Sequence, residues 1–507
     1  MISNFKDINQ LKFGAILSYA NILLSIGVGL LLTPYIIKSL GDSEYGLYTL
    51  IGSFVAYLSL MDLGLNYTVV RFVAKYRAEK DNDGERNFLN TAMFIYIIIS
   101  VVLVLIGIGL YFNLNVIFSE SLTTEQLADA KIMYLILLFN LAITLPGNTF
   151  TAICNGYEHF IFPRTISVLR YVLRTFTVYA VIKFGGKAIA LVLIDTFFNL
   201  FLISSSFLYT RIKLKVVVNF RRASLKEMKQ IFSYSSWIFI STIVFSFQWR
   251  AGQIVLGINL NTVVVAIYAV GIMLGSYYTT FASAINSIIV PKATQMVVAN
   301  SNGSQLTKMM IKVGRLNNYL MLLVLSGFFL FGSEFIKLWL GDNYEDSWMV
   351  ALLIMVVYTI PMTQTFGNAI IEARNKIAFR AIWDITSMVI AVIIGFFASK
   401  NYGIIGMISS LVVAKAINVI AINFYFMYIF KFEILHFFKK TYLLQLIVVG
   451  GLSYVFFILK GYVSVSSWER LMLSIVLYTL LYALLSYKFI FTIEEKNMIK
   501  KNVLNRS

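Results

Sequence analysis

Runs of about 20 apolar residues, separated by short polar segments, recur from one end of the chain to the other. A helix of about 20 residues crosses the roughly 30 Å hydrocarbon core of a bilayer, so each run predicts a transmembrane helix. Fourteen spans are predicted, at about residues 12–37, 45–70, 88–112, 130–152, 164–183, 188–209, 231–257, 262–290, 312–331, 347–371, 377–398, 402–429, 441–459 and 467–488. An even number of spans places both termini on the same side of the membrane.

The composition supports an all-α polytopic membrane protein. Of the 507 residues, 59% have hydrophobic side chains and only 13% are charged, whereas soluble domains carry about 25% charged residues. The polar segments between the spans are too short to form a separate soluble domain. The membrane bundle is therefore expected to carry the function.

The sequence lacks the short motifs of common enzymatic chemistry. It contains no GxxxxGK[ST] loop for ATP, no HExxH helix for a metal and no GxSxG turn for a nucleophile. The single cysteine, Cys154, excludes an intramolecular disulfide, and the two histidines, His159 and His436, are far apart in sequence. We therefore expect no enzyme, no ATP-driven pump, no metal site and no cofactor.

The net charge of +18 follows the predicted topology. With the N-terminus in the cytoplasm, the inside segments and adjoining span ends hold 30 of the 42 Lys and Arg residues, the outside ones hold 8, and four lie within spans. This positive-inside bias predicts that both termini are cytoplasmic. It accounts for most of the charge without nucleic acid as a partner.

The chain also matches itself weakly at an offset of 216 residues. The aligned pairs include Thr149 with Thr365, Phe150 with Phe366, Arg164 with Arg380 and Ile166 with Ile382. Since six spans separate equivalent positions, the matches predict two parallel six-helix lobes, an arrangement found in secondary transporters. The predicted domains are residues 1–210 with spans 1–6, a basic cytoplasmic linker at 211–230, residues 231–430 with spans 7–12, and residues 431–507 with spans 13–14 and a cytoplasmic tail.

Two prolines lie at nearly matching places in the two predicted lobes, Pro146 in span 4 and Pro361 in span 10. Each removes a backbone hydrogen bond and should kink its helix. Two interpretations stay open: the prolines are hinges that move during transport, or they are static kinks.

Four basic side chains lie inside predicted spans. Arg170 and Arg174 share one face of span 5, Arg250 lies in span 7 and Lys415 in span 12. An arginine near the bilayer centre costs from about 3 to more than 10 kcal/mol, so such side chains face a bundle interior or a water-filled cavity. These residues predict a central cationic cavity between the lobes.

The deep acidic residues are Asp195 in span 6 and Asp384 in span 11. They can pair with the basic residues and fix helix packing, or serve as coupling sites for H⁺ or Na⁺, and both interpretations stay open. Four basic residues against two acids leave two positive charges for an anionic substrate. Phosphate or pyrophosphate suits arginine, which binds such groups through two parallel hydrogen bonds.

The segment from Leu31 to Ala78 resembles the N-terminal region of Wzx-type polysaccharide flippases. The most specific features are the LG-x-x-x-YG-x-Y pattern at 40–48, the Asp-Leu-Gly sequence at 62–64, and Arg71. These flippases belong to the superfamily that also contains multidrug (MATE) exporters and the lipid II flippase. The rest of the chain resembles this family in topology and composition.

The resemblance implies a bacterial inner-membrane protein that moves undecaprenyl-pyrophosphate-linked oligosaccharide repeat units to the periplasmic face by alternating access. The repeat units would serve the biosynthesis of O-antigen, capsule or another surface polysaccharide. The implied partners are this lipid-linked glycan, membrane lipids, a coupling H⁺ or Na⁺ ion and the polysaccharide polymerase machinery. We expect Arg170, Arg174, Arg250 and Lys415 to hold the pyrophosphate and the first sugars.

Two other functions fit the sequence less well. A MATE-like exporter of cationic drugs would be expected to have an anionic cavity, which the charge count disfavours. A membrane-embedded glycan polymerase or ligase would be expected to carry a large periplasmic loop, whereas the longest predicted outside loops are about 113–129 and 332–346.

Overall fold

The structure is a computed structural model that describes residues 3–58, 65–217, 228, 231, 250–283, 293, 295–297, 299, 301–374, 376–462, 466–493 and 495–497. Within these residues, all regular secondary structure is helical. The chain divides into two compact units, Met1–Ala266 and Ile267–Ser507, which we call the N-terminal and C-terminal units.

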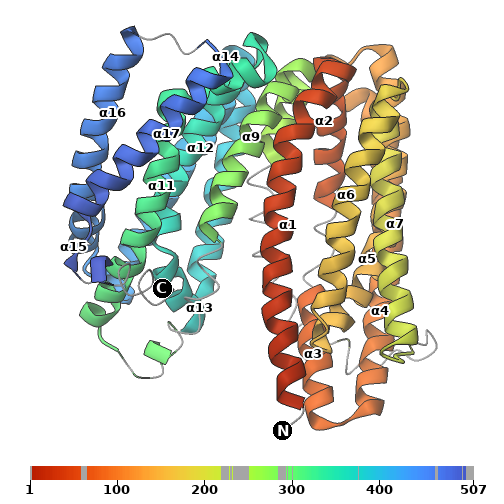
Figure 1. Cartoon of the computed structure of the whole chain (residues 1–507). Coiled ribbons are helices and arrows are strands. Elements are labelled where there is room, and N and C mark those ends of the chain that lie inside the picture. Colours follow the sequence, from red (N-terminus) through yellow and green to blue (C-terminus); the bar gives the residue numbers. More distant parts are fainter. Residues whose placement is uncertain are drawn as a thin grey trace. The chain divides into compact units, whose positions relative to one another are not determined.

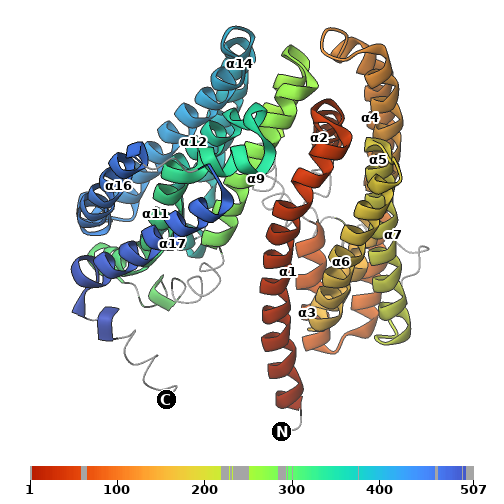
Figure 2. The ribbon, with the colours of Figure 1, turned by 45° about the horizontal axis from the view of Figure 1, so that its top comes forward.

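In the N-terminal unit, long helices run alongside one another (Figures 1 and 2). They are α1 (Ser3–Leu40), α2 (Asp42–Leu58), α3 (Leu65–Glu79), α4 (Asn82–Ile117), α5 (Thr124–Gly156), α6 (Ile161–Lys183) and α7 (Ala188–Ile212). Helix α5 packs against α2, α3, α4 and α7, and α1 packs along α6. Helix α5 is therefore in contact with most of the other helices of this unit.

The C-terminal unit contains most of α9 (Thr262–Ser283), which begins in the N-terminal unit. Its other helices are α11 (Gly303–Leu340), η3 (Asp342–Tyr344), α12 (Asp346–Thr363), α13 (Thr365–Ala373), α14 (Ile377–Ile429), α15 (Ile434–Phe438), η4 (Lys439–Leu443), α16 (Leu444–Tyr462), α17 (Trp468–Leu485) and η5 (Ser486–Ile490). Helix α11 packs against α12, α13, α16 and α17.

Local sequence signals explain where two of the long helices begin. The side chain of Thr123 accepts a hydrogen bond from the backbone of Gln126, whose side chain accepts one from the backbone of Thr123. Asn302 and Gln305 make the same reciprocal pair at the start of α11. Each capping box satisfies two backbone N–H groups that the helix leaves unpaired.

The predicted membrane spans can be followed in the described helices. By length and apolar composition, 11 helices in the described part of the chain could each cross a membrane. The helix at Ala378–Ile429 contains two predicted spans, since Gly403, with a φ of 56°, interrupts it. The predicted all-α polytopic fold is confirmed.

Some predicted features lie wholly or partly outside the described residues. These are residues 59–64 of span 2, including the Asp-Leu-Gly sequence, most of span 7 at 231–257, and most of the basic linker at 211–230.

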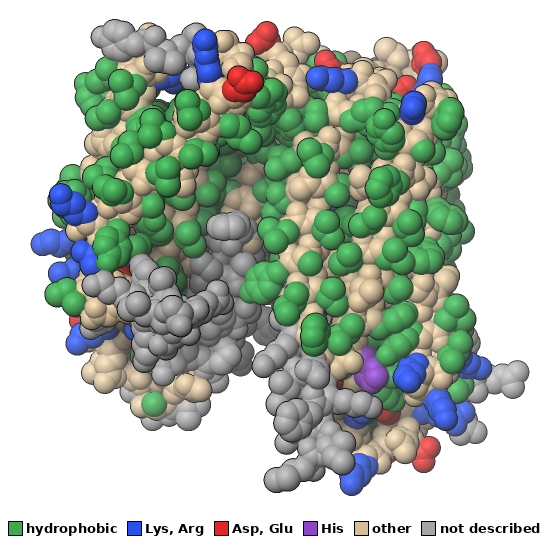
Figure 3. All heavy atoms as spheres, in the orientation of Figure 1, with side chains coloured by type: hydrophobic (Ala, Val, Ile, Leu, Met, Phe, Trp, Pro, Cys, Tyr) green, Lys and Arg blue, Asp and Glu red, His purple; other side chains and the backbone are tan. Residues whose placement is uncertain are grey.

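The distribution of side chains fits a protein surrounded by lipid. Many large apolar side chains are exposed on the helices, including Leu105, Phe197 and Ile394. Figure 3 shows hydrophobic side chains along the helix flanks of each unit, with basic and acidic side chains concentrated near the helix ends. This is the arrangement that a hydrocarbon layer between two aqueous phases favours.

Candidate substrate site

The N-terminal unit contains a polar network on three helices. The Arg174 guanidinium on α6 donates through Nε to Asp195 Oδ1 on α7. The Tyr48 hydroxyl on α2 donates to Asp195 Oδ2 over 2.7 Å. The Arg174 and Asp195 side chains are 24% and 26% exposed, so the charges are largely withdrawn from the surroundings. Such a pair lets both charges lie within a membrane helix bundle.

Tyr48 reaches this network because the LG-x-x-x-YG-x-Y segment at 40–48 forms a tight junction between α1 and α2. Gly41 ends α1 with a φ of 85°, a conformation that suits glycine. Glu44 accepts a hydrogen bond of 2.9 Å from the Ala188 N–H at the start of α7. Gly46 allows α2 to approach the backbone at Thr262, since a Cβ there would lie 1.8 Å from the Thr262 carbonyl oxygen.

Arg170 lies one helical turn before Arg174, as the sequence predicts for residues four apart. Its guanidinium carbon is 5.2 Å from the centre of the Tyr171 ring. Its Nε is buried and has no hydrogen-bond partner, and within the described residues no Asp or Glu forms a salt bridge with it. Arg170 is therefore a cation in a predicted span whose buried Nε–H makes no hydrogen bond to the described residues.

The C-terminal unit contains a second ion-pair network, formed by the two halves of α14. Lys415 Nζ lies 3.3 Å from Asp384 Oδ1 and 5.6 Å from the centre of the Tyr358 ring. Arg380 Nε lies 3.6 Å from Asp384 Oδ2. Asp384 is therefore placed between two basic side chains.

The structure thus brings each deep acid against one of the predicted substrate-binding residues. Asp195 is paired with Arg174, and Asp384 is paired with Lys415. Arg250 is exposed at the start of the helical stretch 250–259. Tyr48 and Arg380 were not expected from the sequence as parts of these networks. The family-like pattern at 40–48 was the signal for Tyr48, and the i, i+4 spacing to Asp384 was the signal for Arg380.

The two prolines have different surroundings. Pro146 lies inside the continuous helix α5. Near it, Asn199 Nδ2 lies 2.6 Å from Asn140 Oδ1 and 2.5 Å from Thr144 Oγ1. Pro361 lies near the end of α12, just before Gln364 separates α12 from α13. A hinge at either proline stays a prediction.

No cluster of metal ligands accompanies these networks. Within the described residues, no group of three or more His, Cys, Asp or Glu side chains is placed to hold a metal ion. The polar side chains of both networks form ion pairs and hydrogen bonds.

Comparison with solved structures identifies the class of fold. The chain superposes on the lipid II flippase MurJ, in an inward closed conformation, with a TM-score of 0.71 and 16% identity, over 96% of this chain and 99% of that chain. It also superposes on an inward-facing multidrug resistance MATE family transporter of the MOP superfamily, with a TM-score of 0.59 and 14% identity, over 85% of this chain and 100% of that chain. At these identities the likeness establishes a shared fold.

Sequence comparison identifies the family. Residues 12–297, more than half of the chain, match the family described as "Polysaccharide biosynthesis protein". The chain belongs to this family. A relative from Bacillus subtilis (strain 168), the "Uncharacterized membrane protein EpsK", is 22% identical over 498 residues, which are 94% of this chain and 95% of the relative. The resemblance inferred from residues 31–78 is thereby confirmed at the level of polysaccharide flippase-type proteins.

Proposed function

We propose that the protein is a flippase that moves undecaprenyl-pyrophosphate-linked oligosaccharide repeat units across the bacterial inner membrane by alternating access, for the synthesis of a surface polysaccharide. Its membership of the polysaccharide biosynthesis family and the fold it shares with MurJ support this proposal. A charged glycan head cannot cross hydrocarbon unaided, so a protein must offer it a polar path while the lipid tail remains in the membrane.

The main support for the proposal is the missing hydrogen-bond partner of Arg170 in the described part of the chain. This side chain lies in a predicted membrane span, yet its buried Nε–H has no hydrogen-bond partner among the described residues. An unsatisfied buried donor is costly, and an arginine is costlier still. A pyrophosphate would supply both the missing acceptors and the missing negative charge, and the planar guanidinium would bind it through two hydrogen bonds.

Arg174 and Lys415 take part by exchanging partners. In the structure their charges are matched by Asp195 and Asp384. An arriving pyrophosphate would compete with these carboxylates for the two basic side chains. A carboxylate released from its basic partner within the helix bundle would need another cation, such as H⁺ or Na⁺, to balance its charge. The exchange would thus couple substrate binding to H⁺ or Na⁺, and Arg250 would add a further positive charge to the path.

The first test measures the pool of polyprenyl-linked saccharides in cells that lack this gene, by extraction and mass spectrometry. An impermeant glycan-modifying enzyme reports on which side of the membrane they lie. We expect complete repeat units to accumulate on the cytoplasmic face. Accumulation of unpolymerised units outside would instead indicate a polymerase or ligase, and an unchanged pool with increased drug sensitivity would indicate a drug exporter.

The second test removes the unpaired charge at Arg170. Arg170→Gln should lower the rate of repeat-unit translocation about tenfold or more, because a charge-assisted hydrogen bond contributes about 1.5–3 kcal/mol. Lys183→Gln, which removes one positive charge from the exposed end of the same helix, is the matched control. Equal translocation by both variants at equal membrane levels would exclude Arg170 from the substrate path. We expect Arg174→Ala to abolish translocation as well.

A further inference from the structure

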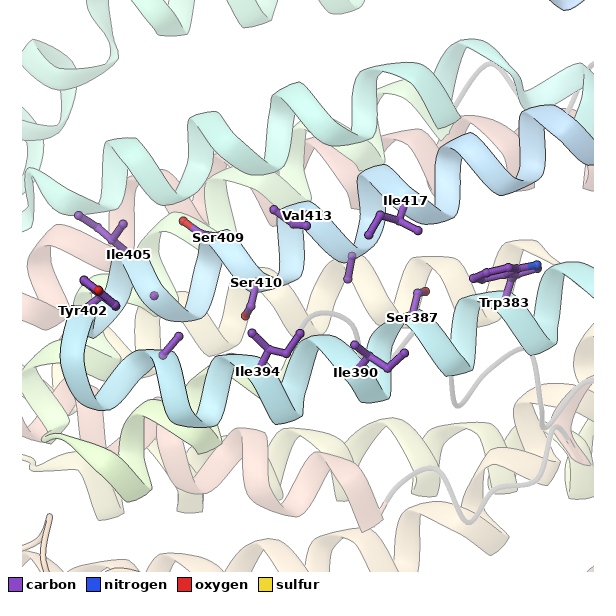
Figure 4. Close-up of a pocket in the computed structure, with 13 residues that line it drawn as sticks. Trp383, Ser387, Ile390, Ile394, Tyr402, Ile405, Ser409, Ser410, Val413 and Ile417 are labelled. Atoms are coloured by element: carbon purple, nitrogen blue, oxygen red, sulfur yellow. The ribbon is translucent and has the colours of Figure 1, made fainter.

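An open groove runs between the two halves of α14, on either side of Gly403 (Figure 4). Its volume is about 410 Å³, and its lining is almost entirely apolar. Trp383 lies at one end and Tyr402 at the other, with Ile390 and Ile394 along one wall and Val413 along the opposite wall. The groove lies in the C-terminal unit, whereas Arg170 and the Arg174–Asp195 pair lie in the N-terminal unit.

Small residues on the floor explain why the groove exists. Gly406 packs against the other half of α14, and a Cβ at this position would lie 2.4 Å from the Ala398 carbonyl oxygen. The floor therefore brings the two backbones close together, while larger side chains stand at the rim. Ile394 and Val413 are 54% and 57% exposed, so the rim is open to a hydrocarbon chain.

A basic side chain stands at each end of the groove. Arg380 precedes Trp383 by three positions and continues the same helical stripe. Arg380 Nη1 lies 3.8 Å from Glu372 Oε1, and Arg380 Nε lies 3.6 Å from Asp384 Oδ2. Both distances are too long for a hydrogen bond. Lys400, near Tyr402, is exposed, and its Nζ lies 5.0 Å from the centre of the Phe396 ring.

The distance between these two basic residues matches the thickness of the hydrocarbon layer. Twenty residues separate Arg380 from Lys400 on the helix that precedes Gly403. At 1.5 Å per residue they are about 30 Å apart, which is about the full width of a bilayer core. The acyl chain of an ordinary phospholipid occupies one leaflet, or about half of this length.

We propose that the groove between the halves of α14 binds the polyprenyl chain of the substrate, with the pyrophosphate at Arg380 before translocation and at Lys400 after it. This inference rests on the proposed function. A polyprenyl chain is apolar and longer than one leaflet, which suits a groove that extends across both. Its doubly charged head suits a basic residue at each end. The chain can therefore remain on one surface of the protein while the head changes sides.

The test compares two adjacent isoleucines of α14. Ile394 lines the groove and Ile393 does not, and both are 54% exposed. Purified wild-type protein, Ile394→Trp and Ile393→Trp are each titrated with undecaprenyl pyrophosphate in detergent and weighed by native mass spectrometry. We expect Ile394→Trp to bind the lipid about tenfold more weakly, since the indole excludes several methylene groups from the groove. Ile393→Trp should bind like the wild type.

A second comparison tests the head contacts. Arg380→Gln and Lys400→Gln should each weaken binding of undecaprenyl pyrophosphate but not of undecaprenol, which lacks the charged head. Binding of undecaprenyl pyrophosphate by Ile394→Trp at wild-type strength would overturn the inference. The inference would also be overturned if Ile394→Trp weakened binding of phosphatidylglycerol but not of undecaprenyl pyrophosphate, because the groove would then hold a bilayer lipid.

The result is separable from the test of the proposed function. If the lipid-linked saccharides accumulate inside cells that lack the gene, but Ile394→Trp binds and translocates normally, the flippase function stands and the groove inference fails. If the saccharide pool is unchanged and the wild-type protein binds no undecaprenyl pyrophosphate, both fail.

Discussion

His159 lies in the short connection between α5 and α6, where its Nδ1 is 2.8 Å from the Tyr209 hydroxyl. Burial and the positive charges of Arg77 and Lys213 lower the pKa of His159 below its ordinary value of 6.5. At a pH well above 6.5 the ring is neutral in both folded and unfolded chains. As the pH falls below this value the unfolded chain takes up the proton first, so the folded state loses stability.

We therefore expect the wild type to melt at a lower temperature near pH 5.5 than near pH 7.5, and His159→Gln to lose less stability over this interval. Thermal unfolding of the purified protein in detergent at the two pH values measures the difference. His436→Gln is the control, since His436 is exposed, and it should follow the wild type. An identical loss of stability in the wild type and His159→Gln would show that another group is responsible.

The ionisable residues in the spans show what residue types alone can predict. The sequence predicted that Arg170, Arg174, Lys415, Asp195 and Asp384 would be withdrawn from lipid, because isolated charges are not stable there. Spacing along a helix also placed Arg170 and Arg174 on one face. Which basic residue meets which acid depends on how neighbouring helices are rotated and shifted, and only the folded units supplied that answer.

Among the helix contacts, α2 approaches the start of α9 closely at Gly46, where a Cβ would lie 1.8 Å from the Thr262 carbonyl oxygen. We expect Gly46→Ala to lower the free energy of unfolding by about 2 kcal/mol or more, because the new methyl group would overlap the Thr262 backbone. For a unit of this size, the melting temperature should fall by about 4–8 °C. Thermal unfolding in detergent provides the measurement.

Gly52 is the matched control in the same helix, since a Cβ there meets no atom within 4 Å. Gly52→Ala should be neutral or stabilising by up to about 1 kcal/mol, because alanine favours a helix more than glycine does. If Gly46→Ala and Gly52→Ala have the same melting temperature, the close approach of α2 to Thr262 is not required for stability.

The starts of two helices agree with the weak internal repeat in the sequence. Helices α6 and α14 begin at Ile161 and Ile377, which are separated by the offset of 216 residues found in the sequence. Hydrophobic length predicted the elements well because each span must cover the same hydrocarbon thickness. The break at Gly403 fell between two predicted spans, while Gln364 divides predicted span 10 into α12 and α13. Apolar length alone did not mark that second break, since both pieces are apolar, but it lies three residues after Pro361, where a kink was predicted from the proline.

At the scale of the whole molecule, the distribution of basic residues predicts the topology. Single cysteines introduced by Lys80→Cys and Glu120→Cys would lie in exposed connections on opposite sides of the membrane. An impermeant maleimide should label Glu120→Cys in spheroplasts, and Lys80→Cys only after permeabilisation. The native Cys154 is fully buried, so the unmodified protein should remain unlabelled. The reverse pattern would place the termini in the periplasm.

Residue types and their spacing were enough to predict the class of molecule: an all-helical membrane protein with basic residues inside its spans. These features follow from lengths, residue types and periodicities, which act over a few turns of one helix. Folding sets the partners of those residues: Tyr48 donates to Asp195, Arg380 lies beside Asp384, and the Arg170 Nε has no hydrogen-bond partner among the described residues. It also formed the groove between the halves of α14. The contact of Tyr48 with Asp195 joins helices far apart in sequence, and the groove depends on how the two halves of α14 pack, so neither is specified by a single helical segment.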